Sequence, residues 1–180
     1  MKKFLATFIF SSFTVLIFAQ TYKAVDNGSS VKFVIKNFGI NTGGTFNGLD
    51  GTITYDPANL SAASFDVSVD AKTIDTDVES RDNHLRKEEY FNVEKFPTLN
   101  FKSSKVTKTN SNDFLYMFGN ITIKGVSKEI KFPFKATPKD DGILFEGNFK
   151  LNRRDFGVGG NSLSLSDELT VTLSVFARKS

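Results

Sequence analysis

Apolar and polar residues alternate with a period of two along most of the chain, which is the pattern of β-strands with one buried face. The alternation is clearest in "SVKFVIKNF", "SFDVSVDA" and "ELTVTLSVFA". Four further stretches share it: "TLNFKSSKV", "FLYMFGNITIKG", "EIKFPFKA" and "GILFEGNFKL". With "GTFNGLDGTITYD" as a strand that glycines interrupt, the pattern predicts about eight strands.

Short segments rich in glycine and polar residues separate these strands and predict turns: "DNGSS", "FNGLDG", "DPANLS", "TNSND" and "KDDG". The spacing is that of hairpins, so neighbouring strands should be antiparallel, as in a β-sandwich or a β-barrel. The stretch "FLYMF" is apolar on both faces. The pattern therefore leaves open whether Leu115, Tyr116 or Met117 points inward.

Residues 77–92 depart from the period of two, because "DVESRDNHLRKEEYFN" has charged residues at helical spacing. Val78, Leu85, Tyr90 and Phe91 are its few apolar anchors. We predict a short, irregular helical connector between two strands. In a barrel it would cap one end, with Leu85 and Phe91 pointing inward and the charges outward.

This connector holds His84, the only histidine of the chain. A catalytic histidine needs a nucleophile or acid partner at hydrogen-bond distance and a third group that orients it. Asp82, Glu88 and Ser80 are close in sequence, but no nucleophile motif surrounds them. We interpret the segment as a structural cap, in which Arg81 and Asp82 form an ion pair or a helix cap. An enzyme would instead need His84 to face a cavity within reach of Ser, Asp or Glu.

A second unusual stretch is "LNRRDFGVGGNS", from Leu151 to Ser162. It contains the Asp-Phe-Gly triplet of protein kinases, but the glycine-rich loop, the strand lysine and the catalytic loop of a kinase are missing. The pattern favours the end of a strand followed by a glycine-rich loop. We expect Arg153 or Arg154 to pair with a carboxylate near the rim of the barrel.

The start of the chain has the parts of a secretory signal peptide, since two lysines precede an apolar run from Phe4 to Phe18 and Ala19 follows. A helix that spans a bilayer needs about 20 apolar residues, so this run is short for a span. We predict a signal peptide at residues 1–19, one domain at residues 20–180, and a periplasmic or secreted location. No stable membrane insertion is expected after removal of the signal.

The composition excludes several kinds of site and partner. Without the two lysines of the predicted signal, 21 basic residues face 20 acidic ones, which gives no electrostatic reason to expect nucleic acid binding. The chain has no cysteine and one histidine, so zinc and copper would lack their usual ligands. The acidic residues do not have the spacing of an EF-hand loop. We expect neither a metal nor another cofactor.

Several motifs occur together and in a fixed order: "VKFVIKNFGI", "GTFNGLDGTITYD", "RDNHL", "EEYFNVEKFPTLNF", "GNITIKGVSKEIKFPF" and "NRRDFGVG". With them the chain resembles the YceI family of lipid- and polyisoprenoid-binding proteins, from about Tyr22 to Arg178. The resemblance implies an all-β fold, a lipocalin-like antiparallel eight-stranded β-barrel with a short helical connector. It also implies an exported, non-catalytic carrier that holds an isoprenoid or fatty-acyl chain in an apolar tunnel.

The inward positions of the predicted strands are the candidate ligand-binding residues, and most of them are phenylalanine, valine or isoleucine. They are Phe33, Ile35, Phe46, Phe65, Val67, Val69, Phe101, Ile121, Ile123, Phe132, Phe134, Phe145, Phe149, Val171 and Leu173. An eight-stranded barrel is just wide enough to be filled by side chains or to hold one small ligand. The sequence leaves both outcomes open.

Two other functions remain as alternatives to a carrier of isoprenoid or other long-chain lipid. One is a lipid-modifying enzyme that uses the same cavity, with His84 as its base. The other is a stress-related envelope scaffold with a filled barrel, which would be marked by an exposed apolar patch outside the barrel. The oligomeric state is also open, with a homodimer as one candidate.

Overall fold

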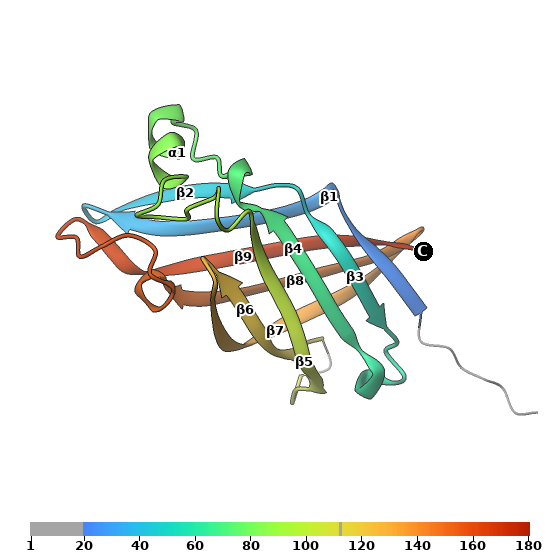
Figure 1. Cartoon of the computed structure of the whole chain (residues 1–180). Coiled ribbons are helices and arrows are strands. Elements are labelled where there is room, and N and C mark those ends of the chain that lie inside the picture. The colour runs from blue at the N-terminus through green and yellow to red at the C-terminus, as the bar shows by residue number, and fades with distance from the viewer. Residues whose placement is uncertain (1–19, 112) are drawn as a thin grey trace, which may run out of the picture.

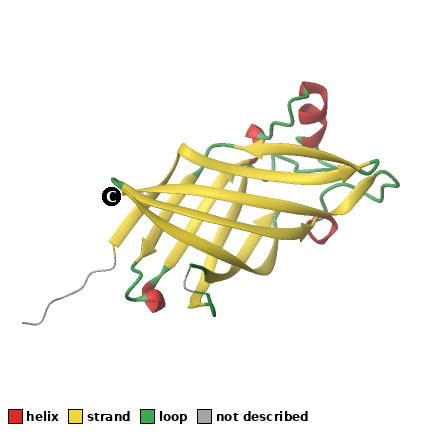
Figure 2. Cartoon of the chain, turned by 180° about the vertical axis from the view of Figure 1, so that it is seen from behind, coloured by secondary structure: helices red, strands yellow, loops and turns green. Residues whose placement is uncertain are grey.

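The computed structural model describes residues 20–111 and 113–180, so the predicted signal peptide lies outside the described residues. Antiparallel strands make up most of the described chain (Figures 1 and 2). They are β1 (Gln20–Asn37), β2 (Ile40–Phe46), β3 (Asp50–Tyr55), β4 (Ser64–Asp70), β5 (Thr98–Lys108), β6 (Leu115–Ile123), β7 (Val126–Lys139), β8 (Gly142–Asn152) and β9 (Leu165–Lys179). The helical pieces are η1 (Leu60–Ala62), η2 (Ala71–Thr73), α1 (Glu79–Leu85) and η3 (Arg153–Phe156). None of the helices in this part of the chain has the length and apolar character needed to cross a bilayer.

The strands form one sheet that closes on itself, because β9 pairs with β1 as well as with β8. β2 and β3 lie along the same edge of β1, where β2 pairs with Val31–Asn37 and β3 pairs with Gln20–Lys23. A break at residues 47–49 separates the two short strands, so together they fill one position of the barrel. The predicted all-β, lipocalin-like antiparallel eight-stranded barrel with a short helical connector is therefore confirmed.

The segment "DNGSS" is a bulge inside β1, and its prediction as a turn between strands is wrong. The pairing of β1 with β9 shifts register between Val25 and Ser30. At the bulge, the Ser29 side chain takes the place of backbone hydrogen bonds between β1 and β9. Its Oγ donates to the Val25 carbonyl at 2.5 Å and accepts from the Phe176 amide at 2.8 Å. The Asp26 carboxylate ties the bulge to the break between β2 and β3. After the bulge, odd-numbered instead of even-numbered residues face inward.

Strand β6 settles which face of "FLYMF" points inward. Met117 is buried and Leu115 packs against the core. Tyr116 and Phe118 lie on the outer face, where Lys131 Nζ is 4.0 Å and 5.1 Å from their ring centroids. The two aromatic rings are thus covered by a cation on the surface and take no part in the interior.

Aromatic side chains fill the half of the barrel nearest the C-terminus. The Phe145 ring lies 5.1 Å from Phe65, 5.3 Å from Tyr55 and 6.3 Å from Phe134, measured between ring centroids. Most of these contacts are edge-to-face, which is the favourable arrangement of aromatic pairs. All four residues are buried, as is the neighbouring Tyr22. We refer to these five residues as the aromatic cluster, and it makes this half of the barrel a packed core.

The two tyrosines of the aromatic cluster predict a response to alkaline pH. Burial, with a smaller contribution from the Asp56 carboxylate, raises the pKa of Tyr22 and Tyr55 above the usual 10.0. The folded state keeps these protons longer than the unfolded state, so the stabilisation is complete below pH 10.0 and is lost as the pH rises through the folded-state pKa. We expect the free energy of unfolding to fall less steeply with alkaline pH in a Tyr22→Phe/Tyr55→Phe variant than in the wild type. Urea unfolding at a series of alkaline pH values measures the two slopes, and equal slopes would contradict this expectation.

The connector between β4 and β5 lies beside β2, at the edge of the barrel (Figure 1). A single bridge joins them, in which Thr45 and Asp75 exchange backbone hydrogen bonds of 2.8 Å and 3.1 Å. The buried Asp82 carboxylate accepts from the Thr76 amide at 3.0 Å, and Arg81 Nε donates to the Thr76 hydroxyl at 2.7 Å. Arg81 and Asp82 therefore fix the turn that precedes α1. They act through Thr76, and not as the ion pair or helix cap that the sequence suggested.

Candidate functional site

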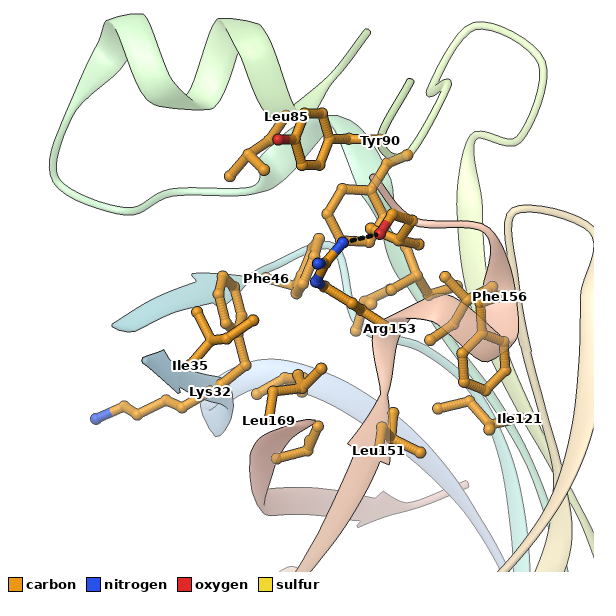
Figure 3. Close-up of a pocket in the computed structure, with 18 of the residues that line it drawn as sticks. Lys32, Ile35, Phe46, Leu85, Tyr90, Ile121, Leu151, Arg153, Phe156 and Leu169 are labelled. Atoms are coloured by element: carbon orange, nitrogen blue, oxygen red, sulfur yellow. Dashed lines mark hydrogen bonds between the residues drawn. The ribbon is translucent and has the colours of Figure 1, made fainter. Parts of the chain in front are cut away.

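The half of the barrel opposite the aromatic cluster encloses a cavity of about 400 Å³. Most of its lining consists of apolar side chains from the strands. Figure 3 shows Leu85 and Tyr90 of the connector on one side of it, and Leu151 and Leu169 on another. The cavity reaches the surface where the partly or fully exposed side chains of Asn37, His84 and Ser162 join its lining. We refer to this opening as the mouth.

Twelve of the fifteen candidate ligand-binding residues line this cavity. These twelve are Phe33, Ile35, Phe46, Val67, Val69, Phe101, Ile121, Ile123, Phe132, Phe149, Val171 and Leu173. The other three, Phe65, Phe134 and Phe145, do not line it, because they belong to the aromatic cluster. All fifteen share the inward face of the barrel, so period two places them correctly on that face but does not separate the hollow half from the filled half.

Glycines explain why bulky rings leave this half of the barrel open. Three glycines occupy inward positions, and a phenylalanine ring of a neighbouring strand lies over each one. The pairs are Phe33 over Gly44, Phe101 over Gly119, and Phe132 over Gly147. A Cβ atom at Gly44 would lie 2.5 Å from the Phe33 ring, and one at Gly119 would lie 2.6 Å from the Phe101 ring. The missing side chains let the rings fold against the wall, so the centre of the barrel is left free.

The connector contributes side chains to the lining of the cavity, and the inward direction predicted for two of its four apolar anchors is confirmed. Leu85 and Phe91 point inward and line the cavity, and Tyr90 also lines it. Val78 does not act as an anchor, since 43 % of it is exposed. It is the N-cap residue of α1, where the backbone is still extended.

Other lining residues were absent from the candidate list for two different reasons. Leu99, Leu151 and Leu169 continue the same alternation toward the strand ends, and the signal for them was present in the sequence. Phe156 and Val158 come from η3 and the loop after it. A loop has no periodicity, so no sequence pattern could have placed these two side chains in the cavity.

Arg153 is buried beside the cavity and organises the loop between η3 and β9 (Figure 3). Its guanidinium donates to four backbone carbonyls at 2.9–3.4 Å, which are those of Val158, Gly160, Leu165 and Ser166. It also donates to Asp167 Oδ1 at 2.7 Å, which is the carboxylate pair expected at the rim. All five N–H groups of the guanidinium are thereby used. Arg153 therefore holds the loop and has no free donor for a ligand.

His84 lies at the mouth, with its Nε2 3.1 Å from Glu89 Oε1 and its ring 4.9 Å from that of Tyr90. The histidine and glutamate side chains are each about half exposed. The requirement that an enzyme would place on His84, a position facing the cavity within reach of a carboxylate, is thus met. A nucleophile is the part that is missing, because within residues 20–111 and 113–180 no hydroxyl makes a hydrogen bond to His84. The Thr76 hydroxyl bonds to Arg81 instead.

Acidic and histidine side chains do not gather into a group of three or more that could hold a metal ion anywhere in the described ranges. The polar side chains that line the cavity are hydroxyls, asparagine amides and four basic residues, which are Lys32, Arg81, His84 and the saturated Arg153. The site can therefore enclose an apolar molecule and offer it weak polar contacts at the mouth.

Known proteins are similar to this chain in sequence and in fold. The model of the YceI-like domain matches residues 22–177. Protein YceI of Salmonella agona (strain SL483) is 34% identical, and the match covers 97% of this chain and 97% of the relative.

Two solved structures have the same architecture. Burkholderia cenocepacia BcnA gives a TM-score of 0.80 at 21% identity and covers 85% of this chain and 98% of BcnA. A polyisoprenoid binding domain from Saccharophagus degradans gives a TM-score of 0.73 at 12% identity, with 90% of this chain and 99% of that domain covered. At these identities the two structures establish a shared fold. The family model and the 34% identity establish more, and the chain belongs to the YceI-like domain family.

Proposed function

We propose that this protein is an exported, non-catalytic carrier that holds one isoprenoid or fatty-acyl chain in the cavity. The observation that supports this most directly is an apolar cavity that is blocked at one end by the aromatic cluster and open at the other. A polyisoprenoid binding domain with the same fold is a second support. Export is supported by the order of basic, apolar and small residues at the start of the chain.

The size of the cavity fits an aliphatic chain. A group the size of a water molecule takes about 30 Å³ in the liquid, so 400 Å³ accommodates about a dozen methylene-sized groups. Burial of each methylene contributes about 0.8 kcal/mol, which sums to roughly 10 kcal/mol before the cost of association. A longer isoprenoid would extend through the mouth. Selectivity would then follow from chain length and width, and only weakly from polar contacts.

Native mass spectrometry of protein purified from its own host tests this proposal, since a co-purifying chain adds a defined mass. The same spectrum reports whether the mature chain begins near Gln20. We expect Val171→Phe, within the cavity on β9, to reduce or shorten the retained lipid, because the larger ring occupies ligand space. The melting temperature of the lipid-free variant should stay close to that of the wild type.

Ala177→Phe is the matched control on the same strand. Ala177 is fully buried beside the aromatic cluster, so the larger side chain should overpack the core at a cost of about 1–3 kcal/mol. Strong destabilisation by Val171→Phe with lipid retention unchanged would mean that the cavity is filled in solution, and the carrier proposal would lose its physical basis.

The geometry of His84 keeps a lipid-modifying enzyme as a second candidate, because a base and an orienting carboxylate face the cavity. A carrier does not need this pair, and a half-exposed contact of this kind contributes at most about 1 kcal/mol to stability. We expect the His84→Ala variant to retain lipid within about threefold of the wild type. We also expect no enzymatic turnover that depends on His84. Retention is measured by native mass spectrometry and turnover by incubation with lipid esters. An esterase activity that His84→Ala removes would establish the enzyme instead.

A further inference from the structure

Three large apolar side chains are exposed together at the open end of the barrel. Phe38 is 81% exposed, Ile40 is 71% exposed and Leu163 is fully exposed. The first two belong to the β1–β2 hairpin, and Leu163 belongs to the loop between η3 and β9. The Phe38 amide donates to the Ser164 carbonyl at 2.8 Å, which joins the two loops side by side, at the left of Figure 1 and the right of Figure 2. We refer to these three side chains as the apolar tip.

The backbone at Phe38 is strained in a way that packing within the described chain does not explain. Phe38 has a φ of 50° and Gly39 a φ of 78°, so the two-residue hairpin is left-handed at both central positions. Such turns favour Asn-Gly or Asp-Gly, and a bulky residue with positive φ is an unfavourable outlier. Packing within the chain does not compensate for this strain, because the ring is almost entirely in solvent. Strain that folding does not explain is a reason to look for a function.

The apolar tip lies next to the mouth of the cavity. Asn37, which precedes Phe38, lines the cavity, and so do Ser162 and Ser164 on either side of Leu163. The apolar tip therefore forms one side of the mouth through which a chain would enter or leave. Any surface that holds the tip is also placed against the opening.

The charged residues in the paired part of the β1–β2 hairpin that carries Phe38 and Ile40, residues 31–46, are all basic. The acidic residues after the second loop, Asp167 and Glu168, are paired with Arg153 and Lys150. No acidic residue occurs between Asn27 and Leu49, and the loop at residues 157–166 has no charged residue at all. Lys32 and Lys36 are exposed on the outer face of β1, on either side of Val34. Neither lysine forms an ion pair with any residue that the structure describes, although two connector carboxylates share a shallow surface hollow with Lys32. Lysines beside an apolar surface suit anionic lipid headgroups, because their stems lie along apolar groups while the amines reach the headgroups.

We propose that the apolar tip docks this protein on the surface of a lipid bilayer, with Lys32 and Lys36 facing anionic headgroups. The contact is peripheral, since three side chains on two loops reach only the boundary between headgroups and acyl chains. A second copy of the chain is a poorer partner. Stable protein interfaces bury about 800 Å² on each side, which exceeds what these loop tips offer, and the lysines of two copies would repel each other. This proposal goes beyond the carrier function, because it assigns a surface and a partner outside the cavity.

A tryptophan placed in the apolar tip tests the docking directly, because the chain has no tryptophan of its own. The probe is the mature chain with Phe38→Trp, mixed with vesicles of phosphatidylcholine that contain phosphatidylglycerol. We expect a blue shift of the emission and quenching by brominated acyl chains. The matched control is Phe114→Trp, since Phe114 is also exposed (44%) but lies in the loop between β5 and β6, at the other end of the barrel (Figure 1). Its emission should not respond to vesicles.

Phe38→Asn separates docking from folding, because asparagine suits positive φ. Its melting temperature should equal or exceed that of the wild type, whereas co-sedimentation with the anionic vesicles should fall about tenfold or more. Lys32→Gln/Lys36→Gln should remove the advantage of anionic over neutral vesicles. Lipid retention in the cavity, measured by native mass spectrometry, should stay unchanged in Phe38→Asn and in Lys36→Gln alone, because neither residue lines the cavity, whereas Lys32 does. A failure of docking and a failure of cavity binding therefore give different results.

Three results would overturn the docking proposal. The first is an unchanged emission of the Phe38→Trp protein on addition of vesicles. The second is a Phe38→Asn variant that still sediments with vesicles as the wild type does. The third is a dimer in analytical ultracentrifugation that Phe38→Asn dissociates while vesicle binding is absent throughout, which would make the tip an interface between copies of the chain.

Discussion

Phe145→Ala should lower the free energy of unfolding by about 3–5 kcal/mol, because it removes a buried ring from a close-packed cluster and leaves a cavity. The Phe145 ring contacts the rings of Tyr55, Phe65 and Phe134, and 6% of the residue is exposed. For a domain of this size, each kcal/mol lowers the melting temperature by about 2–4 °C. A thermal melt of the lipid-free protein should therefore show a drop of roughly 6–20 °C.

Phe149→Ala is the matched control, four residues further along β8 and on the same inward face. Its ring lines the cavity and has Phe132 as its aromatic neighbour, at 4.8 Å between centroids. Removal of Phe149 enlarges a space that already exists, so we expect a smaller cost than for Phe145→Ala. It consists of the aromatic pair with Phe132, about 0.5–1.5 kcal/mol, and the burial of a ring that is only partly buried. The loss should appear instead in the retention of lipid. Equal destabilisation by the two substitutions would contradict the division of the barrel into a filled and a hollow half.

This pair of residues also shows what the sequence could and could not establish. Phe145 and Phe149 have the same residue type, the same strand and the same alternation, so any periodic argument gives them the same role. Their difference comes from the opposite walls. Three aromatic rings converge on Phe145, whereas the rings near Phe149 lie back over glycines. Such partners are distant in sequence, and a single chain contains no local signal for them.

Most of the strands were predictable because they follow a rule that acts between near neighbours, although "FLYMF" does not alternate and β1 changes phase at its bulge. Period-two alternation placed the eight barrel positions correctly, including the strand that a break divides into β2 and β3. The failures occur where a side chain replaces the expected backbone pattern. "DNGSS" has the composition of a turn, but Ser29 hydrogen-bonds across to β9 and keeps the strand continuous as a bulge.

In the connector and in the loop after η3, too, local patterns were predictable and contacts between distant residues were not. The anchors Leu85 and Phe91 could be inferred because charged residues surround them and an inward direction was the only apolar environment available. Phe156 and Val158 could not, since their positions depend on how Arg153 gathers the loop around itself. The sequence predicted a carboxylate partner for an arginine in this stretch. It gave no indication that four carbonyls would converge on the same guanidinium.

That convergence leads to the second large effect, which is expected for Arg153→Met. The substitution keeps much of the apolar stem but removes every donor to the loop, and it leaves buried carbonyls without partners. A buried, hydrogen-bonded charge that loses its partner costs about 3–5 kcal/mol, and each unsatisfied carbonyl contributes to that sum. Because the Asp167 side chain is half exposed and water can solvate it, the loss of stability should lie at the lower end of this range, near about 3 kcal/mol. Denaturant unfolding measures it, and hydrogen exchange should show faster opening of residues 157–166.

Two variants decide whether the effect comes from this network. Arg154→Met removes the neighbouring arginine, which is exposed and bonds to Asn161, so its cost should stay within about 0.5 kcal/mol. Arg153→Lys keeps the charge but has three donors on a point cation instead of five in a planar fork. It can satisfy Asp167 and part of the loop, so its stability should lie between those of the wild type and Arg153→Met. If Arg153→Lys were fully as stable as the wild type, the charge alone would hold the loop; if Arg154→Met were as damaging as Arg153→Met, the network would not be centred on the buried guanidinium.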